Sequence, residues 1–153
     1  MARTKIFISY SHKDDRWLEL VKEQLAVLEI AGLIEIFEDK RIGAGEVWKD
    51  RLDSEMLSAK LAVLLVSAPF LTSGFIRESE VPVLFRNHEQ DGMTLYPLLV
   101  RACAWQEIPW LARLQMRPAE SIPVSSLSGA KREQCLADVA REIADIVKPA
   151  STA

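Results

Sequence analysis

Apolar residues along the chain occur either in short runs rich in β-branched and aromatic residues or at intervals of three and four residues. The short runs predict β-strands. They occupy residues 6–10, 34–37, 61–66 and 94–100, and residues 122–124 form a weaker fifth candidate. In the run at 61–66 no polar position alternates with the apolar ones, which predicts a strand buried on both faces. This pattern is typical of a parallel sheet that helices cover on both sides.

Segments with helical spacing of their apolar residues lie between and after these runs. They cover residues 15–30, 48–56, 76–87 and 136–146, and a short additional helix is predicted at 110–114. Each long segment gathers its apolar side chains on one stripe, which must pack against a neighbouring layer. Gly32 predicts the end of the first helix, because glycine readily adopts the left-handed conformation that follows a helix.

Strand and helix therefore alternate along the chain, and 153 residues suit a single α/β domain. Right-handed crossovers then predict a flavodoxin-like, doubly wound, five-stranded parallel sheet of order 2-1-3-4-5 with helices on both faces. Pro97 predicts that the strand at 94–100 is not fully paired on both sides or carries a bulge. We expect the domain to span residues 1–148, and residues 149–153 have the composition of a tail or linker.

Composition and charge narrow the possible functions. Lys plus Arg number 19 and Asp plus Glu number 22, so the net charge of −3 gives no general attraction for nucleic acid. Cys103 and Cys135 lack the spacing of a zinc site or a disulfide framework, so we expect free thiols and no metal. No apolar run is long enough to span a membrane. The prediction is a cytoplasmic protein that contacts neither nucleic acid nor membrane directly.

The predicted topology also locates a binding site. Open α/β sheets bind ligands at the carboxyl ends of their strands, beside the point where the strand order reverses. Residues 9–12, 39–48 and 67–80 converge there, and they combine aromatic faces with a few charges. The candidate substrate-binding residues are Ser9, Tyr10, Asp39, Arg41, Trp48 and Phe75, and Glu80 supplies a carboxylate.

Several familiar catalytic patterns are missing from the sequence. No GxGxxG follows the first predicted strand, and neither GxxxxGK[ST] nor GxSxG occurs, so dinucleotide-binding Rossmann, P-loop and typical α/β-hydrolase sites lack support. The two histidines are His12 and His88. A single histidine in a polar loop is more often a solvated surface residue than a catalytic base.

A series of short motifs follows the predicted strands. The motifs are Ile6-Phe7-Ile8-Ser9-Tyr10-Ser11 with Asp14-Asp15, Phe37-Glu38-Asp39 with Ile42-x-x-Gly45-x-x-Trp48, Ala62-Val63-Leu64-Leu65-Val66-Ser67 with Phe70-Leu71-x-Ser73-x-Phe75-Ile76, Glu80-Val81-Pro82, and Tyr96-Pro97-Leu98-Leu99. In order and spacing they resemble a TIR (Toll/interleukin-1 receptor) domain of prokaryotic type. The resemblance covers residues 5–146.

The resemblance implies two alternative functions. Many plant and prokaryotic TIR domains cleave NAD+ at the nicotinamide–ribose bond and release ADP-ribose or a cyclic isomer, so NAD+ would be a substrate and no cofactor is implied. Animal receptor and adaptor TIR domains are interaction modules. The leading interpretation is an NAD+ nucleosidase that is activated by self-association in immune or antiphage defence, with a fused or co-encoded sensor module. The alternatives are a non-enzymatic TIR–TIR interaction module and a nucleotide transferase.

The resemblance also implies roles for individual residues. Glu80 matches the essential glutamate of the enzymatic members better than Glu78 does. Many of those members carry an aromatic residue four positions earlier, whereas Phe75 lies five positions before Glu80. The loop with Ile42, Gly43 and Gly45 corresponds to an assembly loop. Lys40 or Arg41 are the candidates for binding the pyrophosphate, and Tyr10, Trp48 or Phe75 could stack on a base.

Each of these residues also has a structural interpretation. Glu80 would be favourable beside the helix dipole as a carboxylate of a first helical turn. Trp48 shares helical spacing with Leu52 and Met56 and fits a core position. Phe75 could pack at the helix entry, and Asp39 could cap a turn.

Overall fold

The computed structural model describes residues 3–38 and 48–148, with the backbone alone for residues 48–50. Several predictions therefore fall outside the described part of the chain. They concern the side chain of Trp48, the tail at 149–153, and the loop residues Asp39, Lys40, Arg41, Ile42, Gly43 and Gly45.

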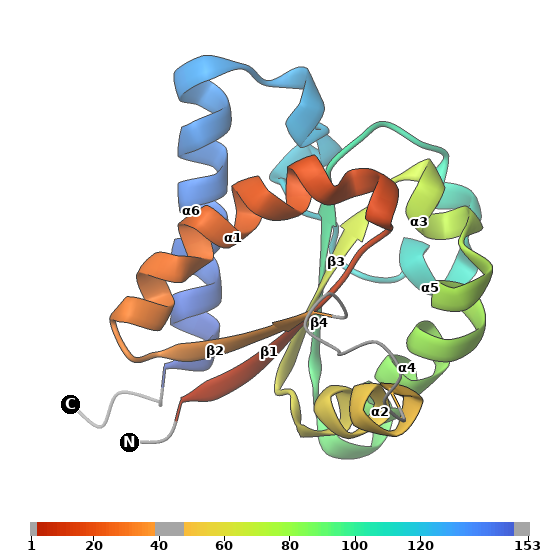
Figure 1. Cartoon of the computed structure of the whole chain (residues 1–153). Helices are drawn as coiled ribbons and strands as arrows, with labels where there is room; N and C mark the ends of the chain where they lie inside the picture. Colours follow the sequence, from red (N-terminus) through yellow and green to blue (C-terminus); the bar gives the residue numbers. More distant parts are fainter. Residues whose placement is uncertain (1–2, 39–47, 149–153) are drawn as a thin grey trace.

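Four parallel strands form the sheet, in the order β2-β1-β3-β4 (Figure 1). The strands are β1 (Thr4–Ser9), β2 (Ile34–Glu38), β3 (Leu61–Val66) and β4 (Thr94–Leu99). All six residues of β3 are buried, as expected for a strand covered on both faces. The predicted parallel α/β architecture and the order of these four strands are confirmed.

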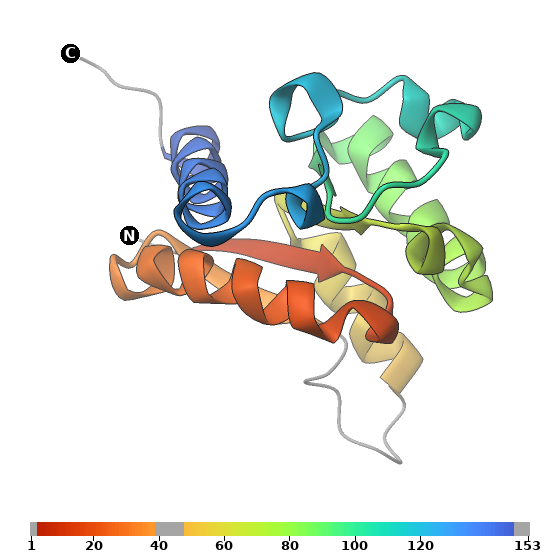
Figure 2. The same ribbon diagram turned by 90° about the horizontal axis from the view of Figure 1, so that it is seen from above.

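Helices cover both faces of the sheet (Figure 2). On one face lie α1 (Asp15–Ile30) and α6 (Gly129–Val147). On the other face lie α2 (Trp48–Ser58), α3 (Ala68–Thr72), α4 (Val81–Asp91) and α5 (Pro109–Ala112). Each face buries its own apolar cluster, so the strands separate two cores. Gly32 has a φ of 79° just after α1, which confirms its predicted role.

Side chains of β1 alternate between these two cores. Ile6 and Ile8 pack under α1 and α6, whereas Phe7 packs with the helices of the other face. Because successive side chains of a strand point to opposite faces, Ser9 continues the row of Phe7. The last residue of β1 therefore points toward the α4 side of the sheet.

The predicted fifth strand at residues 122–124 is wrong. Within the described residues the sheet has four strands, and a 3-10 turn, η6 (Val124–Ser126), follows Pro123. Pro123 cannot donate a ladder hydrogen bond, so this segment does not extend along β4. A single parallel bridge joins Leu98 to Arg117 instead. An open cavity of about 770 Å³ lies next to the edge of β4, against α6.

Pro97 lies in β4, the edge strand of this sheet, as its missing N–H predicts. The carbonyl oxygen of Pro97 accepts a hydrogen bond of 2.9 Å from the backbone N–H of Arg117. On the side of β4 that faces away from β3, the hydrogen bonds to Arg117 thus involve Pro97 and Leu99.

The segment after β3 also differs from the sequence prediction. The sequence pattern predicts no helix between the strand at 61–66 and the helix at 76–87, but α3 begins at Ala68, and Ser67 caps it by accepting a hydrogen bond of 3.1 Å from the backbone N–H of Phe70. The helix predicted at 76–87 consists of two parts, a π-helical turn, η3 (Ile76–Glu80), and α4. Pro82 lies in the first turn of α4, where a missing N–H costs little.

Candidate active site

Ser9 and Glu80 form a buried pair at the carboxyl end of β1, one of the two inner strands. Glu80 closes η3 and directly precedes α4, so it approaches Ser9 from the covering layer. The hydroxyl Oγ of Ser9 donates a hydrogen bond of 2.7 Å to Oε1 of Glu80. Ser9 is 0% exposed and Glu80 is 1% exposed. The structure thus brings together two of the predicted site residues at the expected edge of the sheet.

The π-helical turn explains the unusual spacing between Phe75 and Glu80. The backbone N–H of Val81 bonds to the carbonyl of Ile76, a step of five residues. In an α-helix residues four apart are neighbours on one face, whereas a π turn widens that step to five. The step from Phe75, the residue before η3, to Glu80 is also five residues. Such π turns are frequent at functional sites.

Burial separates the two candidate glutamates. Glu78 lies in the same turn but is exposed, whereas Glu80 is buried and bonded to Ser9. Phe75 is half-buried against the apolar cluster of the α4 face. Ser9, Phe75 and Glu80 therefore belong to one side of the sheet edge.

Tyr10 lies on the opposite side of the sheet. It is 2% exposed within the cluster under α1 and α6, and its ring centroid is 5.4 Å from that of His12. Alternation along β1 makes this unavoidable, because Ser9 already faces Glu80. Tyr10 and Glu80 are not brought together in this structure.

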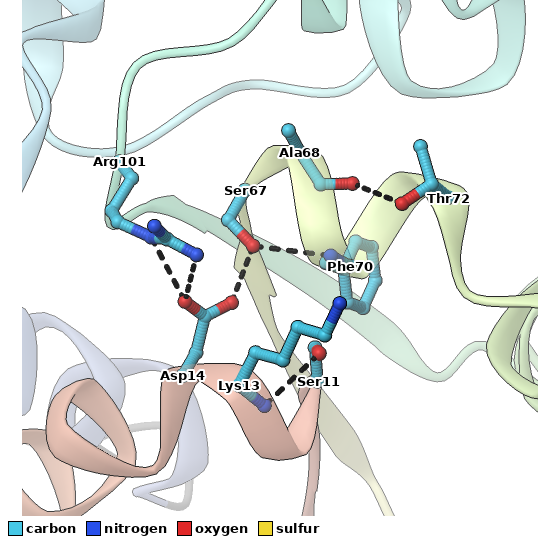
Figure 3. A network of polar contacts seen from close by, with 8 residues as sticks. All are labelled: Ser11, Lys13, Asp14, Ser67, Ala68, Phe70, Thr72 and Arg101. Atoms are coloured by element: carbon cyan, nitrogen blue, oxygen red, sulfur yellow. Dashed lines mark hydrogen bonds and ion pairs between the residues drawn. The ribbon is translucent and has the colours of Figure 1, made fainter.

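A second polar cluster ties three strand ends together at the same edge (Figure 3). Asp14 follows β1 and is 0% exposed, Ser67 follows β3, and Arg101 follows β4. Oδ1 of Asp14 accepts from Nε of Arg101 at 2.9 Å and lies 2.8 Å from its Nη2. Oδ2 of Asp14 accepts from the Ser67 hydroxyl. Both oxygens of this buried carboxylate are thus paired.

Sequence reasoning missed this cluster as a unit. Asp14 stood within a matching motif, but no role followed from that, and its partners lie 53 and 87 positions away. Glu38 was missed as well. It ends β2 at 1% exposure, and its Oε1 lies 3.4 Å from Nζ of Lys22 on α1. For Ser67 and Glu38 the available signal was a polar residue at the carboxyl end of an apolar strand.

Comparison with known proteins identifies the family of this fold and site. The sequence model of the TIR domain matches residues 6–135. The chain belongs to the TIR domain family. The match includes both strand ends that carry Ser9 and Ser67, and it includes Glu80. Self-association is common among TIR domains.

A bacterial relative agrees with the prokaryotic type of this TIR domain. Over 120 residues the chain is 32% identical to "Uncharacterized protein y4lF" of Sinorhizobium fredii (strain NBRC 101917 / NGR234). The match covers 78% of this chain but only 37% of the length of that protein. Among residues 3–38 and 48–148, no helix combines the length and apolarity that a membrane span requires.

Proposed function

We propose that this TIR domain is an NAD+ nucleosidase whose central group is the Glu80 carboxylate. The observation that carries the proposal is the buried hydrogen bond between Ser9 and Glu80 at the carboxyl end of β1. This is the edge at which open α/β sheets bind ligands. Membership of a family that includes NAD+-cleaving enzymes supports the proposal.

The chemistry requires only one carboxylate. The bond between C1′ of the ribose and the nicotinamide nitrogen breaks, and its electron pair leaves with the ring, which becomes neutral. No general acid is needed, unlike in ordinary glycosidases. Glu80 stabilises the positive charge that develops at C1′. Water then attacks C1′ and loses a proton to the solvent to give ADP-ribose, or an adenine nitrogen attacks to give a cyclic isomer.

The burial of Glu80 sets a condition for this reaction. A carboxylate that is 1% exposed does not meet a substrate until part of its cover moves. We propose that association of TIR domains opens and completes the site, so that activity rises with local concentration. The same burial favours the alternative function, a TIR–TIR interaction module in which Ser9 and Glu80 only stabilise the fold.

Nicotinamide release from NAD+ tests the proposal directly. The wild-type chain would be assayed at high concentration and with a crowding agent, beside Glu80→Gln and Glu78→Gln. Glu80→Gln keeps an oxygen that accepts from Ser9, and Glu78 is exposed on the same turn. We expect the Glu80 variant to be at least about 100-fold slower, since removal of one electrostatic stabiliser has effects of that size. We expect the Glu78 variant to match the wild type.

Two results would reject the proposed nucleosidase activity. One is equal activity of Glu80→Gln and the wild type. The other is a wild type that releases no nicotinamide even when chains are clustered, which would support the interaction module. Circular dichroism checks that both variants fold.

The biological setting follows from the same proposal. Depletion of NAD+ or production of a signal nucleotide in the cytoplasm would serve immune or antiphage defence. The relative in Sinorhizobium fredii extends well beyond the matched region. We therefore propose that a sensor module, fused or encoded nearby, controls association of this TIR domain.

A further inference from the structure

Arg101 carries a guanidinium group that is firmly held on one side and open on the other. Its Nε and Nη2 both contact Oδ1 of Asp14, at 2.9 and 2.8 Å. A guanidinium has five N–H donors, so these contacts use two and leave three. The side chain of Arg101 is 41% exposed although its partner Asp14 is 0% exposed. Donors therefore remain for a group that arrives from solvent.

Asp14, which binds Arg101, is itself held in place by hydrogen bonds. The second oxygen of Asp14 is bonded to the Ser67 hydroxyl, which in turn accepts from the N–H of Phe70 in α3. The backbone N–H of Asp14 donates to the carbonyl of Ser11 at 2.7 Å. Because the carboxylate cannot turn, the guanidinium is oriented before any ligand binds, which lowers the entropic cost of binding.

A second cation, Lys13, directly precedes Asp14 in the segment between β1 and α1. Lys13 is exposed, and its backbone N–H donates to the Ser11 hydroxyl at 3.2 Å. In Figure 3 its side chain points from this segment toward Phe70 of α3. Arg101 and Lys13 are the two cationic side chains of the cluster drawn in Figure 3, and its one carboxylate, Asp14, is paired with Arg101.

This edge adjoins the proposed reaction site. Ser9, which binds Glu80, is two residues before Ser11, so their Cα atoms lie within about 7 Å of each other. Glu80 bonds to the end of β1 and Arg101 follows β4, so both residues lie at the same edge of the sheet, with β3 between their two strands. In NAD+ the pyrophosphate is joined to the same ribose that carries nicotinamide.

We propose that Arg101, assisted by Lys13, binds the pyrophosphate of the dinucleotide substrate. This inference rests on the proposed function, and it assigns the anion to the end of β4 rather than to residues 40–41. Guanidinium groups pair with phosphate oxygens through two parallel hydrogen bonds, a geometry that a preoriented arginine favours. Asp14 and Ser67 act as positioning residues for Arg101.

Ligand binding tests this subsite independently of catalysis. Calorimetry would compare ADP-ribose, which has the pyrophosphate but no bond to cleave, with adenosine, which has no phosphate. We expect Arg101→Gln to weaken ADP-ribose binding about 10- to 100-fold, the range for hydrogen bonds to charged groups. Arg101→Lys keeps the charge and a partner for Asp14 and should lose less. Adenosine binding should change less than twofold in each variant, and Arg141→Gln on α6 is the matched control.

Cleavage assays supply the second readout. In Arg101→Gln, kcat/KM for NAD+ should fall while kcat/KM for nicotinamide riboside, which lacks phosphate, is retained. Equal losses for both substrates, or for ADP-ribose and adenosine, would make Arg101 a purely structural residue and overturn the proposal. So would a wild type that does not bind ADP-ribose.

The two proposals can fail separately. Binding of ADP-ribose that depends on Arg101 in a chain that cleaves no NAD+ would retain the subsite and reject the nucleosidase. Cleavage of NAD+ that is insensitive to Arg101→Gln and Arg101→Lys would retain the enzyme and reject the subsite. Thermal unfolding of each variant separates loss of binding from loss of the fold.

Discussion

Ser9 and Glu80 are 71 positions apart in the chain, yet their side chains share a buried hydrogen bond of 2.7 Å. Ser9 ends the inner strand β1, and Glu80 ends a π-helical turn in the helical layer that covers it. The contact therefore joins the sheet to α4 at the edge where a ligand would bind. It fixes the carboxyl group, because one of its two oxygens is held from the strand.

Ser9→Ala removes this link without adding bulk. We expect the free energy of unfolding to fall by about 1–3 kcal/mol, because a buried acceptor loses its donor. Nicotinamide release should slow mainly through kcat, since Ser9 orients Glu80. Urea denaturation and steady-state kinetics measure the two effects. Ser58→Ala, whose exposed hydroxyl bonds only to the carbonyl of Glu55, should leave both unchanged. A Ser9→Ala chain with wild-type stability and kinetics would contradict the prediction.

Ser67→Ala should destabilise the chain more strongly than most serine substitutions. The hydroxyl caps α3 and also donates to buried Asp14. Loss of the cap and of a hydrogen bond to a charged group together predict about 2–4 kcal/mol. Urea denaturation measures this, with Ser126→Ala as the control, since the Ser126 hydroxyl is exposed and bonds only to the carbonyl of Pro123. A loss below about 0.5 kcal/mol, the usual range for surface positions, would contradict the role of Ser67.

The apolar pattern predicted the four observed strands and the layers around them. It failed at residues 122–124, where β-branched residues flank Pro123, and a proline interrupts the hydrogen bonds that a strand needs. The predicted convergence of strand ends also grouped Tyr10 with Glu80. Alternation along a strand, however, requires Ser9 and Tyr10 to face opposite layers.

Long-range polar contacts could not be predicted in the same way. Arg101 lies 87 positions from Asp14, and no local pattern links the two residues. Their contact depends on β1 and β4 ending at the same edge of the sheet, which becomes known only with the topology. Motif matching, in contrast, singled out Glu80, because the order of the motifs along the chain is a local property of the sequence.

The two thiols should react slowly with alkylating agents. Burial raises the pKa of Cys103, and the negative charge of Asp14 adds to this. Burial also raises the pKa of Cys135. Since the thiolate is the reactive form, iodoacetamide at neutral pH should modify both about tenfold more slowly in the folded chain than in urea. Mass spectrometry of digested samples assigns each site. Faster modification of either cysteine in the folded chain would contradict this.

Glu142 on α6 joins the edge strand β4 to the last helix. Its Oε1 accepts hydrogen bonds from the Tyr96 hydroxyl at 2.5 Å and from Nε of Arg117 at 2.6 Å. The bond from Arg117 is the main cause that lowers the pKa of Glu142 in the folded chain. Burial raises the pKa of Tyr96, so its hydroxyl stays a donor at neutral pH.

Glu142 should therefore make stability depend on acidic pH. Because its folded pKa lies below the unfolded value of about 4.3, the ionised group stabilises the fold above that pH and loses this effect as the pH falls through the folded pKa. Glu142→Gln should be less stable than the wild type at pH 7, and the gap should shrink below about pH 4. Urea denaturation between pH 7 and pH 3 measures it. Glu133→Gln, exposed on the same helix, controls for the change in net charge. A gap that stays constant over this range would show that the ion pair with Arg117 contributes no pH-dependent stability.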